Sequence, residues 1–525
     1  MDENAADEKE QLNHENSPVK KCELSFFQKL LIMGVILIIW VIIVIVELVY
    51  TFSQEEDKAE INCIYYISKA GANTTLLGSD FNFNSISQIV IDDDDEITDP
   101  IKEYKFKKVG NHTVKIYIND TINMDYMFKD VNNLISVEMT TNNSTKIASM
   151  RSSFQNCKSL VEFSIKGFDT KKLNNTSHMF DSCEALKSLN LKIDTKNVFD
   201  MSYMFYRCMN LAELNVINFN TSKVVNMSNM FNVVSSITSL NVSNFDTKNV
   251  VDMSEMFRYL ENVENLDLSN FDTQKVQDMS SMFYFCSKIQ KLDISKFITS
   301  NVKDMKYMFA NMANLEELVF EFNTENVENM NHMFHNCKSL KNLEFHKFDT
   351  KNVANMANMF ESCHNLISLE VSAFDTSKVT DFSFMFNQLH SLEKLDISQF
   401  KTSNGQNMKN MFAGNYKLAN LDVSNFDTSK VTDMLMMFYS CNILESLDVS
   451  HFNTKEVKDM GLMFNKCLKL TSLDFTSFNT SQCKNLVSII DKNNTDLTIT
   501  IRNSSDVDNL IKEIEDTQAN IIYNN

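Results

Sequence analysis

The sequence predicts an α/β solenoid: a leucine-rich-repeat array of about 14–15 units, each with a short parallel strand and a short helix. Three observations predict it: a recurring phenylalanine, a row of helix-capping residues before it, and an alternating apolar pair after it. Eleven of the thirteen steps between the phenylalanines are 26 residues, and two are 25. The fourteen positions are Phe128, Phe154, Phe180, Phe205, Phe231, Phe257, Phe283, Phe309, Phe334, Phe360, Phe386, Phe412, Phe438 and Phe464.

The helix of each unit is predicted from the apolar spacing around the phenylalanine. One well-formed copy reads F-D-T-Q-K-V-Q-D-M-S-S-M-F-Y-F-C-S-K-I-Q-K-L-D-I-S-K. In it Met279, Met282, Phe283 and Cys286 stand at i, i+3, i+4 and i+7, which is one face of a helix. Asp278 precedes them, and its counterparts in the other copies are only Asp, Asn or Ser. These residue types cap helix N-termini, so we expect a helix at this point in every copy.

The strand and the return turn complete the unit. Leu292 and Ile294 are apolar at a spacing of two, which predicts a short strand. With Ile289 they form the pattern L-x-x-L-x-L of leucine-rich repeats. Asp272 and Thr273 belong to the return turn, where such side chains bond their own backbone.

The repeat resembles that of the BspA-like leucine-rich-repeat surface proteins. The units F-D-T-S-K-V-T-D-M-L-M-M-F-Y-S-C-N-I-L-E-S-L-D-V-S (426–450) and F-D-T-K-N-V-V-D-M-S-E-M-F (245–257) carry the likeness. It covers about residues 120–483, roughly 70 per cent of the chain. The resemblance implies a cell-surface location and a role in adhesion or recognition. The chain departs from the family in showing no C-terminal cell-wall sorting motif, and its expected anchor is N-terminal.

Five segments are predicted along the chain. Residues 1-29 are a disordered cytosolic tail, and residues 30-50 are a transmembrane signal-anchor helix. Residues 51-119 are a linker and a β-rich N-terminal cap, and residues 120-483 are the leucine-rich-repeat solenoid. Residues 484-525 hold a degenerate last repeat, centred on Ile490, and a C-terminal cap that ends with a helix from Val507 to about Thr517.

The membrane prediction rests on an uncharged apolar run from Leu30 to Val46. With the residues through Tyr50 it spans about 20 residues, enough to cross a bilayer. Lysines precede the run and acidic residues follow it, so the positive-inside rule places the N-terminus in the cytosol and the repeats outside the cell. The alternative is a cleaved signal peptide, although no small-residue cleavage site follows.

Net charge and the absence of catalytic motifs argue against two classes of function, nucleic-acid binding and catalysis. The chain has 69 acidic and 49 basic residues, a formal net charge of −20, which argues against nucleic acid as a partner. Catalytic motifs such as a phosphate loop or H-E-x-x-H are absent from the sequence, and its nine histidines are scattered. We therefore expect neither enzymatic activity nor a cofactor.

A column of acidic residues at the outward strand position is the candidate ligand face. Neighbouring members would lie about 5 Å apart. One interpretation is a face that binds a basic partner or Ca²⁺. The other is a solvated face in which nearby lysines, such as Lys291 and Lys394, reduce the repulsion between the carboxylates. The candidate residues are Asp267, Asp293, Glu344, Glu370, Asp396, Asp422, Asp448 and Asp474.

Two further sets of residues, the cysteines and the N-x-[S/T] sequons, are candidate sites of covalent modification or metal binding. Eight cysteines share the column three residues after the repeat phenylalanine, which Val, Leu or Met occupies in five other copies; they are interpreted as buried free thiols, with disulfides or a metal as the alternatives. Thirteen N-x-[S/T] sequons follow the apolar run, and in a eukaryote some would carry glycans. The named candidates for glycosylation are Asn73, Asn111, Asn119, Asn226, Asn241 and Asn503.

Taken together, the sequence predicts a single-pass protein at the plasma membrane that displays a repeat array outside the cell. The first hypothesis is a binding or adhesion module for a protein or glycan partner. The second is a passive surface coat or variable antigen without a fixed ligand. An enzyme is the least favoured class.

Overall fold

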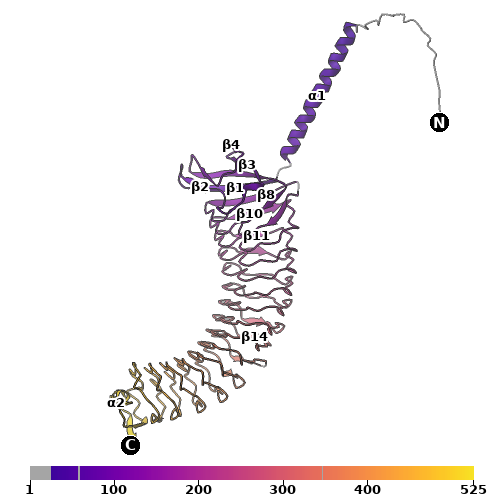
Figure 1. Ribbon diagram of the computed structural model, residues 1–525. Coiled ribbons are helices and arrows are strands. Elements are labelled where there is room, and N and C mark those ends of the chain that lie inside the picture. Colours follow the sequence, from indigo (N-terminus) through magenta and orange to yellow (C-terminus); the bar gives the residue numbers. More distant parts are fainter. Residues whose placement is uncertain (1–24, 57–58, 143, 346, 525) are drawn as a thin grey trace, which may run out of the picture. The chain divides into compact units, whose positions relative to one another are not determined.

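The computed structural model describes residues 25–56, 59–142, 144–345 and 347–524. The chain divides into two compact units, Met1–Lys58 and Ala59–Asn525, and each is described by itself. The second unit is an elongated stack of coils (Figure 1). It is a β-solenoid of about 15 turns with few helices.

The first unit contains one helix, α1, over Phe26–Glu56. The backbone N–H of Gln28 donates to Ser25 Oγ at 3.4 Å, and the N–H of Ser25 donates to Gln28 Oε1 at 3.0 Å. This reciprocal capping box explains why the helix begins at Phe26, earlier than the predicted boundary between 1-29 and 30-50. Residues 1–24 of the predicted tail lie outside the described residues.

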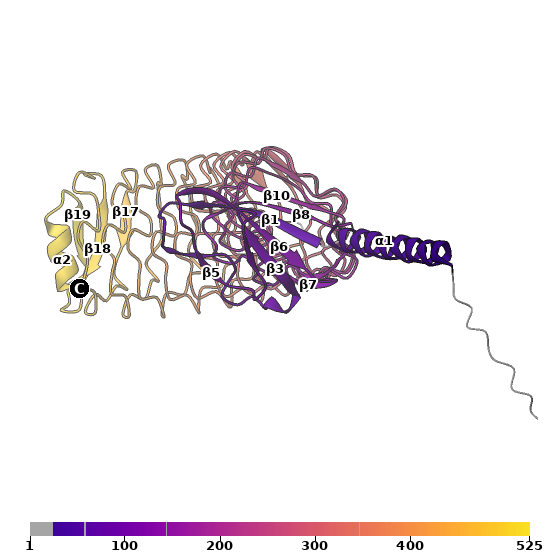
Figure 2. The same cartoon turned by 90° about the horizontal axis from the view of Figure 1, so that it is seen from above.

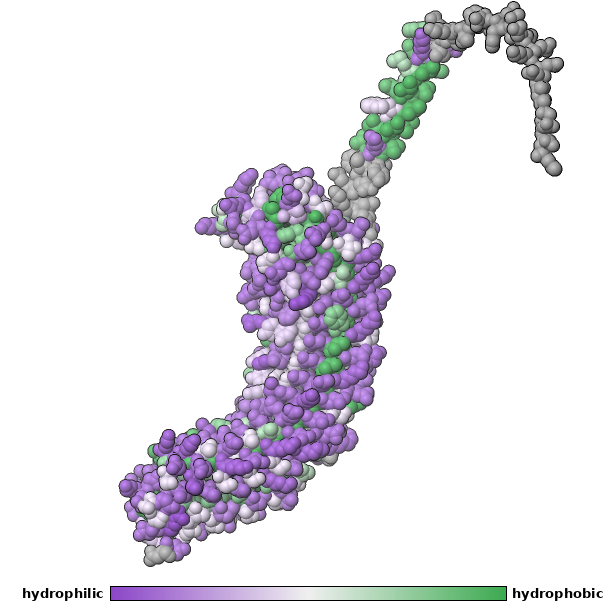
Figure 3. All heavy atoms as spheres, in the orientation of Figure 1, coloured by the Kyte–Doolittle hydropathy of each residue, from purple (hydrophilic) through white to green (hydrophobic). Residues whose placement is uncertain are grey.

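Within α1, the 23-residue stretch Phe26–Leu48 contains a window of 18 residues with a mean hydropathy of 3.2. At 1.5 Å per residue it is about 34 Å long, which matches the hydrocarbon thickness of a bilayer. Figure 3 shows it as a mostly apolar surface that is interrupted by a few hydrophilic residues. The helix fits a single-pass membrane anchor or a signal sequence.

The second unit begins with a six-stranded sheet in the order β10-β8-β1-β6-β3-β4. Strand β1 pairs antiparallel with both β6 and β8, whereas β10 pairs parallel with β8. The change from antiparallel to parallel pairing at β8 is the point where the N-terminal sheet continues into the solenoid. The strands are β1 Ala59–Ile67, β3 Ile86–Ile91, β4 Asp95–Ile97, β6 Gly110–Ile118, β8 Leu134–Thr140 and β10 Glu162–Lys166.

Five shorter elements accompany this sheet. Strand β2 (Asn73–Thr75) pairs antiparallel with β5 (Glu103–Lys105), and the short 3₁₀ helix η1 covers Phe83–Ser85. Strand β7 (Thr121–Asn123) pairs parallel with β9 (Lys146–Ser149), which makes it an early rung of the solenoid.

Further along, the predicted strand position forms short parallel pairs: β11 with β12, β13 with β14, β15 with β16, and β17 with β18. The column of Asp278 forms a second rung, because it makes parallel bridges from coil to coil, as between Asp278 and Asp304. The strands are β11 Ser188–Asn190, β12 Glu213–Asn215, β13 Lys291–Asp293, β14 Glu317–Val319, β15 Asn342–Leu343, β16 Ser368–Leu369, β17 Ser472–Asp474 and β18 Thr498–Arg502.

The prediction of a short helix in every unit is wrong. The segment from Met279 to Cys286 is a run of turns, in which Ser281 and Phe285 have φ of 55° and 62°. These left-handed residues interrupt helical geometry. The N–H groups alternate: that of Phe283 donates to Met308 O in the next coil at 2.9 Å, while that of Met282 donates three residues back to Met279 O.

The capping residue keeps part of its predicted role. Asp278 Oδ1 accepts a hydrogen bond from the N–H of Ser280 at 2.8 Å, which is an Asx turn. The apolar spacing misled the prediction because three-residue turns also place Met279, Met282, Phe283 and Cys286 inside. Turns replace the helix because half of the N–H groups of this segment donate to the neighbouring coil. The segment is therefore stable only within the stack.

The core is a ladder of the fourteen repeat phenylalanines, all of them buried. Neighbouring rings stack with centroids 5.3–6.2 Å apart and interplanar angles of 1–16°. Offset stacking adds to the free energy gained by removing these rings from water. The flanking methionines, such as Met279 and Met282, are buried beside them.

A buried threonine ladder joins the return turns. Thr273 Oγ1 donates to Ile298 O at 2.9 Å and accepts from the N–H of Ile298 at 2.8 Å, so it bonds the next coil and not its own turn. Asp272 does bond its own turn, because its Oδ1 accepts from the N–H of Gln274. Asparagines add a third ladder, as where Asn301 Nδ2 donates to Gln274 O at 2.7 Å.

The C-terminal end contains α2 (Asp508–Glu515), inside the predicted range, and then a strand that was not predicted, β19 (Asn520–Asn524). Leu510 and Ile514 of α2 are buried, and Ile490 forms a bridge with Phe464. Figure 2 shows β17, β18 and β19 side by side at this end. The last rung of the sheet is therefore β19, and α2 does not complete it.

Candidate ligand-binding groove on the strand face

The candidate acidic residues stand at the outward strand position of eight coils, and Val319 occupies this position on the coil between those of Asp293 and Glu344. All are exposed except Asp474, which is half-buried. Most carboxylates are also bonded to their own turn: Asp293 Oδ1 accepts from the N–H of Ser295 at 3.0 Å, and Asp448 Oδ1 does the same with Ser450. Corresponding bonds are made by Asp267, Glu370, Asp396, Asp422 and Asp474. The acidic and serine columns are thus one turn motif, repeated from coil to coil.

These hydrogen bonds fix the charge state of the face. The backbone N–H and then the hydroxyl of the serine two residues later lower the pKa of Asp267, Asp293 and Asp396. For Asp422 and Asp448 the serine hydroxyl is the larger cause of the lowered pKa, ahead of the N–H. The carboxylates are therefore ionised at neutral pH and held in one orientation.

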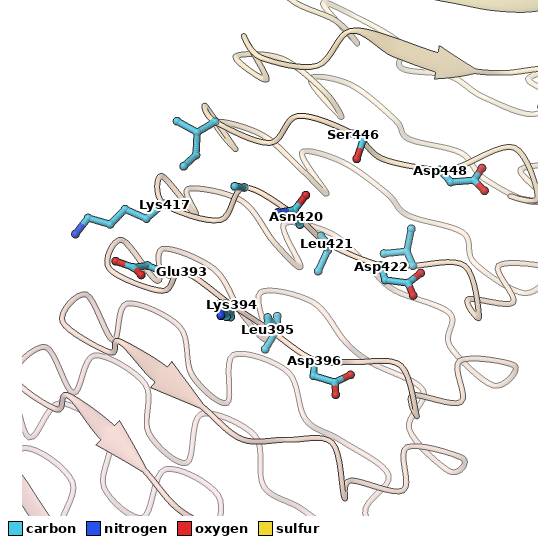
Figure 4. A pocket seen from close by; sticks show the side chains of 13 residues that line it. Glu393, Lys394, Leu395, Asp396, Lys417, Asn420, Leu421, Asp422, Ser446 and Asp448 are labelled. Carbon is cyan, nitrogen blue, oxygen red and sulfur yellow. The ribbon is translucent and has the colours of Figure 1, made fainter.

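Lys291 and Lys394, which were predicted to offset the charge of the acidic column, have different surroundings. Lys291 Nζ lies 2.8 Å from Glu317 Oε2 on the next coil, so its ion pair is with that glutamate. Lys394 lies on the same coil as Asp396, two residues before it, and lines an open groove (Figure 4).

That groove has a volume of about 940 Å³ and crosses three coils. Asp396, Asp422 and Asp448 stand one after another along one side, while Lys417 and Glu393 lie on the other (Figure 4). Leu395, Leu421 and Ile443 give it apolar walls. Four acidic residues and two lysines line the groove, so its net charge is −2. It suits an elongated ligand with basic groups and some apolar surface.

The structure separates the predicted site residues. Asp396, Asp422 and Asp448 come together in this groove, and Glu344 lines a second, more enclosed groove of about 550 Å³ with Glu317 and Phe320. The remaining candidates, which are outside both groove linings, are Asp267, Asp293, Glu370 and Asp474. Among the described residues, no group of three or more His, Cys, Asp or Glu is arranged to hold a metal ion.

An aromatic cluster on the turn face escaped the sequence prediction. Tyr259 lies 5.4 Å from Tyr284 and 5.2 Å from Phe285, and Tyr307 follows at 5.9 Å from Tyr284. The guanidinium of Arg258 lies over the rings of Tyr259 and Tyr284. Aligning the positions within two residues of each repeat phenylalanine, on both sides, would have revealed the cluster. Tyr and Arg at half-buried positions are typical of protein interfaces.

The cysteine column consists of buried free thiols. Cys286 Sγ donates to Phe257 O in the preceding coil at 3.1 Å. Burial raises the pKa of Cys286, Cys363 and Cys441 to about 12. Cys22 lies outside the described residues.

We expect these thiols to be unreactive in the folded protein, because only the thiolate is a strong nucleophile. In a Cys22→Ser chain at pH 8, a chromogenic disulfide reagent should leave the nine buried cysteines unmodified. Half-buried Cys483 alone is expected to react slowly. Unfolding in guanidinium should release all ten described thiols. Rapid modification of several thiols before unfolding would contradict this assignment.

The glycosylation candidates occupy different environments. Asn73, Asn111, Asn119, Asn241 and Asn503 are exposed. Asn226 is half-buried, pairs with the neighbouring coils and accepts a hydrogen bond from the N–H of Ser228. A glycan would fit the exposed positions and would disrupt the stack at Asn226. Glycosylation at any of the six stays a prediction.

These features define a repeat solenoid with an open groove on its strand face. The profile of a family described as "Mycoplasma protein of unknown function, DUF285" matches the chain repeatedly, and the chain belongs to this family. The matched residues are 95–213, 122–241, 187–290, 231–345, 258–368, 341–420 and 406–521. The match supports a repeat family, whereas the likeness to BspA-like proteins stays a prediction.

Comparison with other proteins adds little. No curated protein matches the chain. Among solved structures, one match is the crystal structure of a TLR13-ssRNA13 complex, at 16% identity and a TM-score of 0.17. The alignment covers 71% of this chain and 64%, less than two thirds, of that one. A superposition this poor supports no inference about partners.

Proposed function

We propose that the protein is a single-pass surface protein whose solenoid binds a protein or glycan partner through the groove of Asp396, Asp422 and Asp448. The observation that carries the proposal is this row of ionised, turn-anchored carboxylates beside apolar walls in an open groove. Because the carboxylates are already oriented, a partner's basic groups meet them with little further ordering. The proposal includes no catalytic step.

The direction of display is part of the proposal. The basic residues before the apolar helix and the acidic ones after it favour a cytosolic N-terminus and extracellular repeats. Protease added to intact cells should then digest the repeats. Protection of the repeats until the cells are lysed would overturn this orientation.

The groove is tested by removing charge without removing the turn. In the triple variant Asp396→Asn, Asp422→Asn and Asp448→Asn, each amide oxygen still accepts the serine N–H, but the carboxylate charge is gone. We expect retention of the full-length protein, in lipid nanodiscs, on a partner cell surface to weaken about tenfold or more. Retention of the native protein should also fall with rising salt concentration.

The matched control changes three acidic residues of the return turns, Asp349→Asn, Asp375→Asn and Asp427→Asn. These carboxylates also accept an N–H two residues later, but they lie outside the groove. Equal loss in both triple variants would show that the groove has no special role. If no self or host cell surface retains the native protein, the passive coat becomes the better account.

A second candidate surface is the aromatic cluster of Arg258, Tyr259, Tyr284, Phe285 and Tyr307. Its rings meet in two edge-to-face contacts and one stacked contact, and the Arg258 guanidinium lies over the faces of Tyr259 and Tyr284. Such a surface suits a protein better than a sugar ring. Tyr284→Ala in the same retention assay separates the two surfaces, because it leaves the groove intact.

A further inference from the structure

The outer edge of β19 is open. This strand, Asn520–Asn524, pairs in parallel with β18, and among the described residues no strand pairs with its other side. The side chains of Ile522 and Tyr523 are 48% and 41% exposed. The backbone N–H and C=O groups along such an edge are available to another strand.

The edge also lacks the usual protection against pairing. Exposed edge strands are commonly blocked by a charged residue, a proline or a bulge. The sequence of β19 is N-I-I-Y-N, with neither a charge nor a proline, and its pairing with β18 is regular over all five residues. It therefore favours contact with a further strand.

The pleat determines which groups face that edge. The N–H of Asn520 donates to Leu497 O at 2.8 Å, so the peptide groups of Asn520 point toward β18. Because these directions alternate along a strand, those of Ile522 and Asn524 also point toward β18, and those of Ile521 and Tyr523 point outward. The outer edge thus offers two N–H and two C=O groups.

The strand is nearly symmetric about Ile522. If a second copy of β19 lies antiparallel to the first, Ile522 faces its own counterpart. Ile521 then faces Tyr523, and Asn520 faces Asn524. The two outward-pointing residues fall opposite each other, which allows four backbone hydrogen bonds, while Ile522 sits in a non-hydrogen-bonded pair.

The side chains agree with this register. Ile521 and Tyr523 pair with Ile499 and Ile501 of β18, which are buried, so they share the inner face of the sheet. Tyr523 is further held by its hydroxyl, which donates to Glu515 Oε1 at 2.7 Å. Self-pairing would place an isoleucine beside a tyrosine on each side, a favourable cross-strand combination.

We propose that two copies of this chain associate through β19, antiparallel about a two-fold axis at Ile522. The symmetry is closed, so the product is a dimer joined at the C-terminal ends of the two solenoids. The contact is small, so association is weak for isolated molecules and strengthens where many copies are held on one surface. This association is independent of the groove.

The register is tested by crosslinking in the full-length protein, with Cys22 and Cys483 replaced by serine. Ile522→Cys should form a covalent dimer under mild oxidation, because a non-hydrogen-bonded pair has Cα atoms about 4.5 Å apart, within disulfide range. Asn520→Cys alone should not, since its counterpart lies about 13 Å along the strand. A mixture of Asn520→Cys and Asn524→Cys chains should crosslink.

The affinity is tested by sedimentation of the full-length protein in nanodiscs holding one copy. Ile522→Lys places two like charges opposite each other and should shift the dimer to monomer at concentrations where the native protein is dimeric. Ile298→Lys is the matched control, because Ile298 is 47% exposed on a distant coil and Lys401 occupies the same repeat position. Circular dichroism checks that each variant is folded.

Two results would overturn the proposal. One is crosslinking of Ile522→Cys no faster than that of Asn520→Cys. The other is a native protein that stays monomeric, or one whose association Ile522→Lys leaves unchanged. Neither result bears on the groove variants, which are measured by retention on cells.

Discussion

Replacing Phe283 with alanine is expected to lower the free energy of unfolding by about 3–5 kcal/mol. Phe283 is fully buried, and its ring stacks on both Phe257 and Phe309 at 5.8 Å. The substitution removes apolar contact on two sides and leaves a cavity that rigid neighbouring coils cannot fill. Denaturant unfolding of the full-length protein in nanodiscs measures the loss.

The effect should also be local, because each coil contacts chiefly its neighbours. Amide hydrogen exchange should quicken most in the coils around Phe257 and Phe309 and least at the two ends of the array. The control is Phe199→Ala, since the Phe199 side chain is 48% exposed. A loss as large for Phe199→Ala, or a uniform rise in exchange, would contradict the ladder as the source of stability.

Replacing Thr273 with valine is expected to be nearly as costly, although the two side chains have almost the same shape. The hydroxyl of Thr273 both donates to Ile298 O and accepts from the N–H of Ile298. Thr273 is fully buried, so valine leaves both backbone groups without that partner. Each buried backbone group without a hydrogen-bond partner lowers the free energy of unfolding by about 1–3 kcal/mol.

Thr273→Ser is the matched variant, because it keeps the hydroxyl and removes only a methyl group, at a cost of about 1 kcal/mol. The readouts are the denaturant midpoint and the exchange rate of the Ile298 amide. If valine were tolerated better than serine, packing and not hydrogen bonding would be the role of this ladder.

Much of the architecture was predictable from the chain. The register of the repeat follows from the recurring Phe283 column, because a nearly constant spacing of a large apolar residue favours stacked coils of nearly equal length. The last unit at Ile490 follows from the same register. The turn at Asp272 follows from a side chain that bonds its own backbone, whereas Asp278 was predicted to cap a helix and forms an Asx turn.

The conformation of each coil was not predictable from apolar spacing alone. Met279, Met282, Phe283 and Cys286 have helical spacing, yet they lie on consecutive turns. A helix satisfies its N–H groups within one segment, whereas these turns send alternate N–H groups to the next coil. That choice depends on a neighbour 26 residues away, which local spacing does not contain.

The candidate site was also predictable only in part. The sequence identified the outward acidic column but treated its members as equivalent. The structure groups Asp396, Asp422 and Asp448 in one groove and shows that each carboxylate also holds its own turn. The aromatic cluster around Tyr259 was missed, because residues on consecutive coils become neighbours only after stacking.

By itself, then, the sequence determined that this is a repeat protein with an apolar N-terminal helix, how its coils are spaced, and which columns are buried. These properties follow from periodicity and composition, which are written along the chain. The tertiary structure alone decided that the coils are turns instead of helices, which carboxylates share a groove, and that β19 forms the last rung. Each of these depends on hydrogen bonds and packing between coils, where the partner is set by the stack and not by nearby residues.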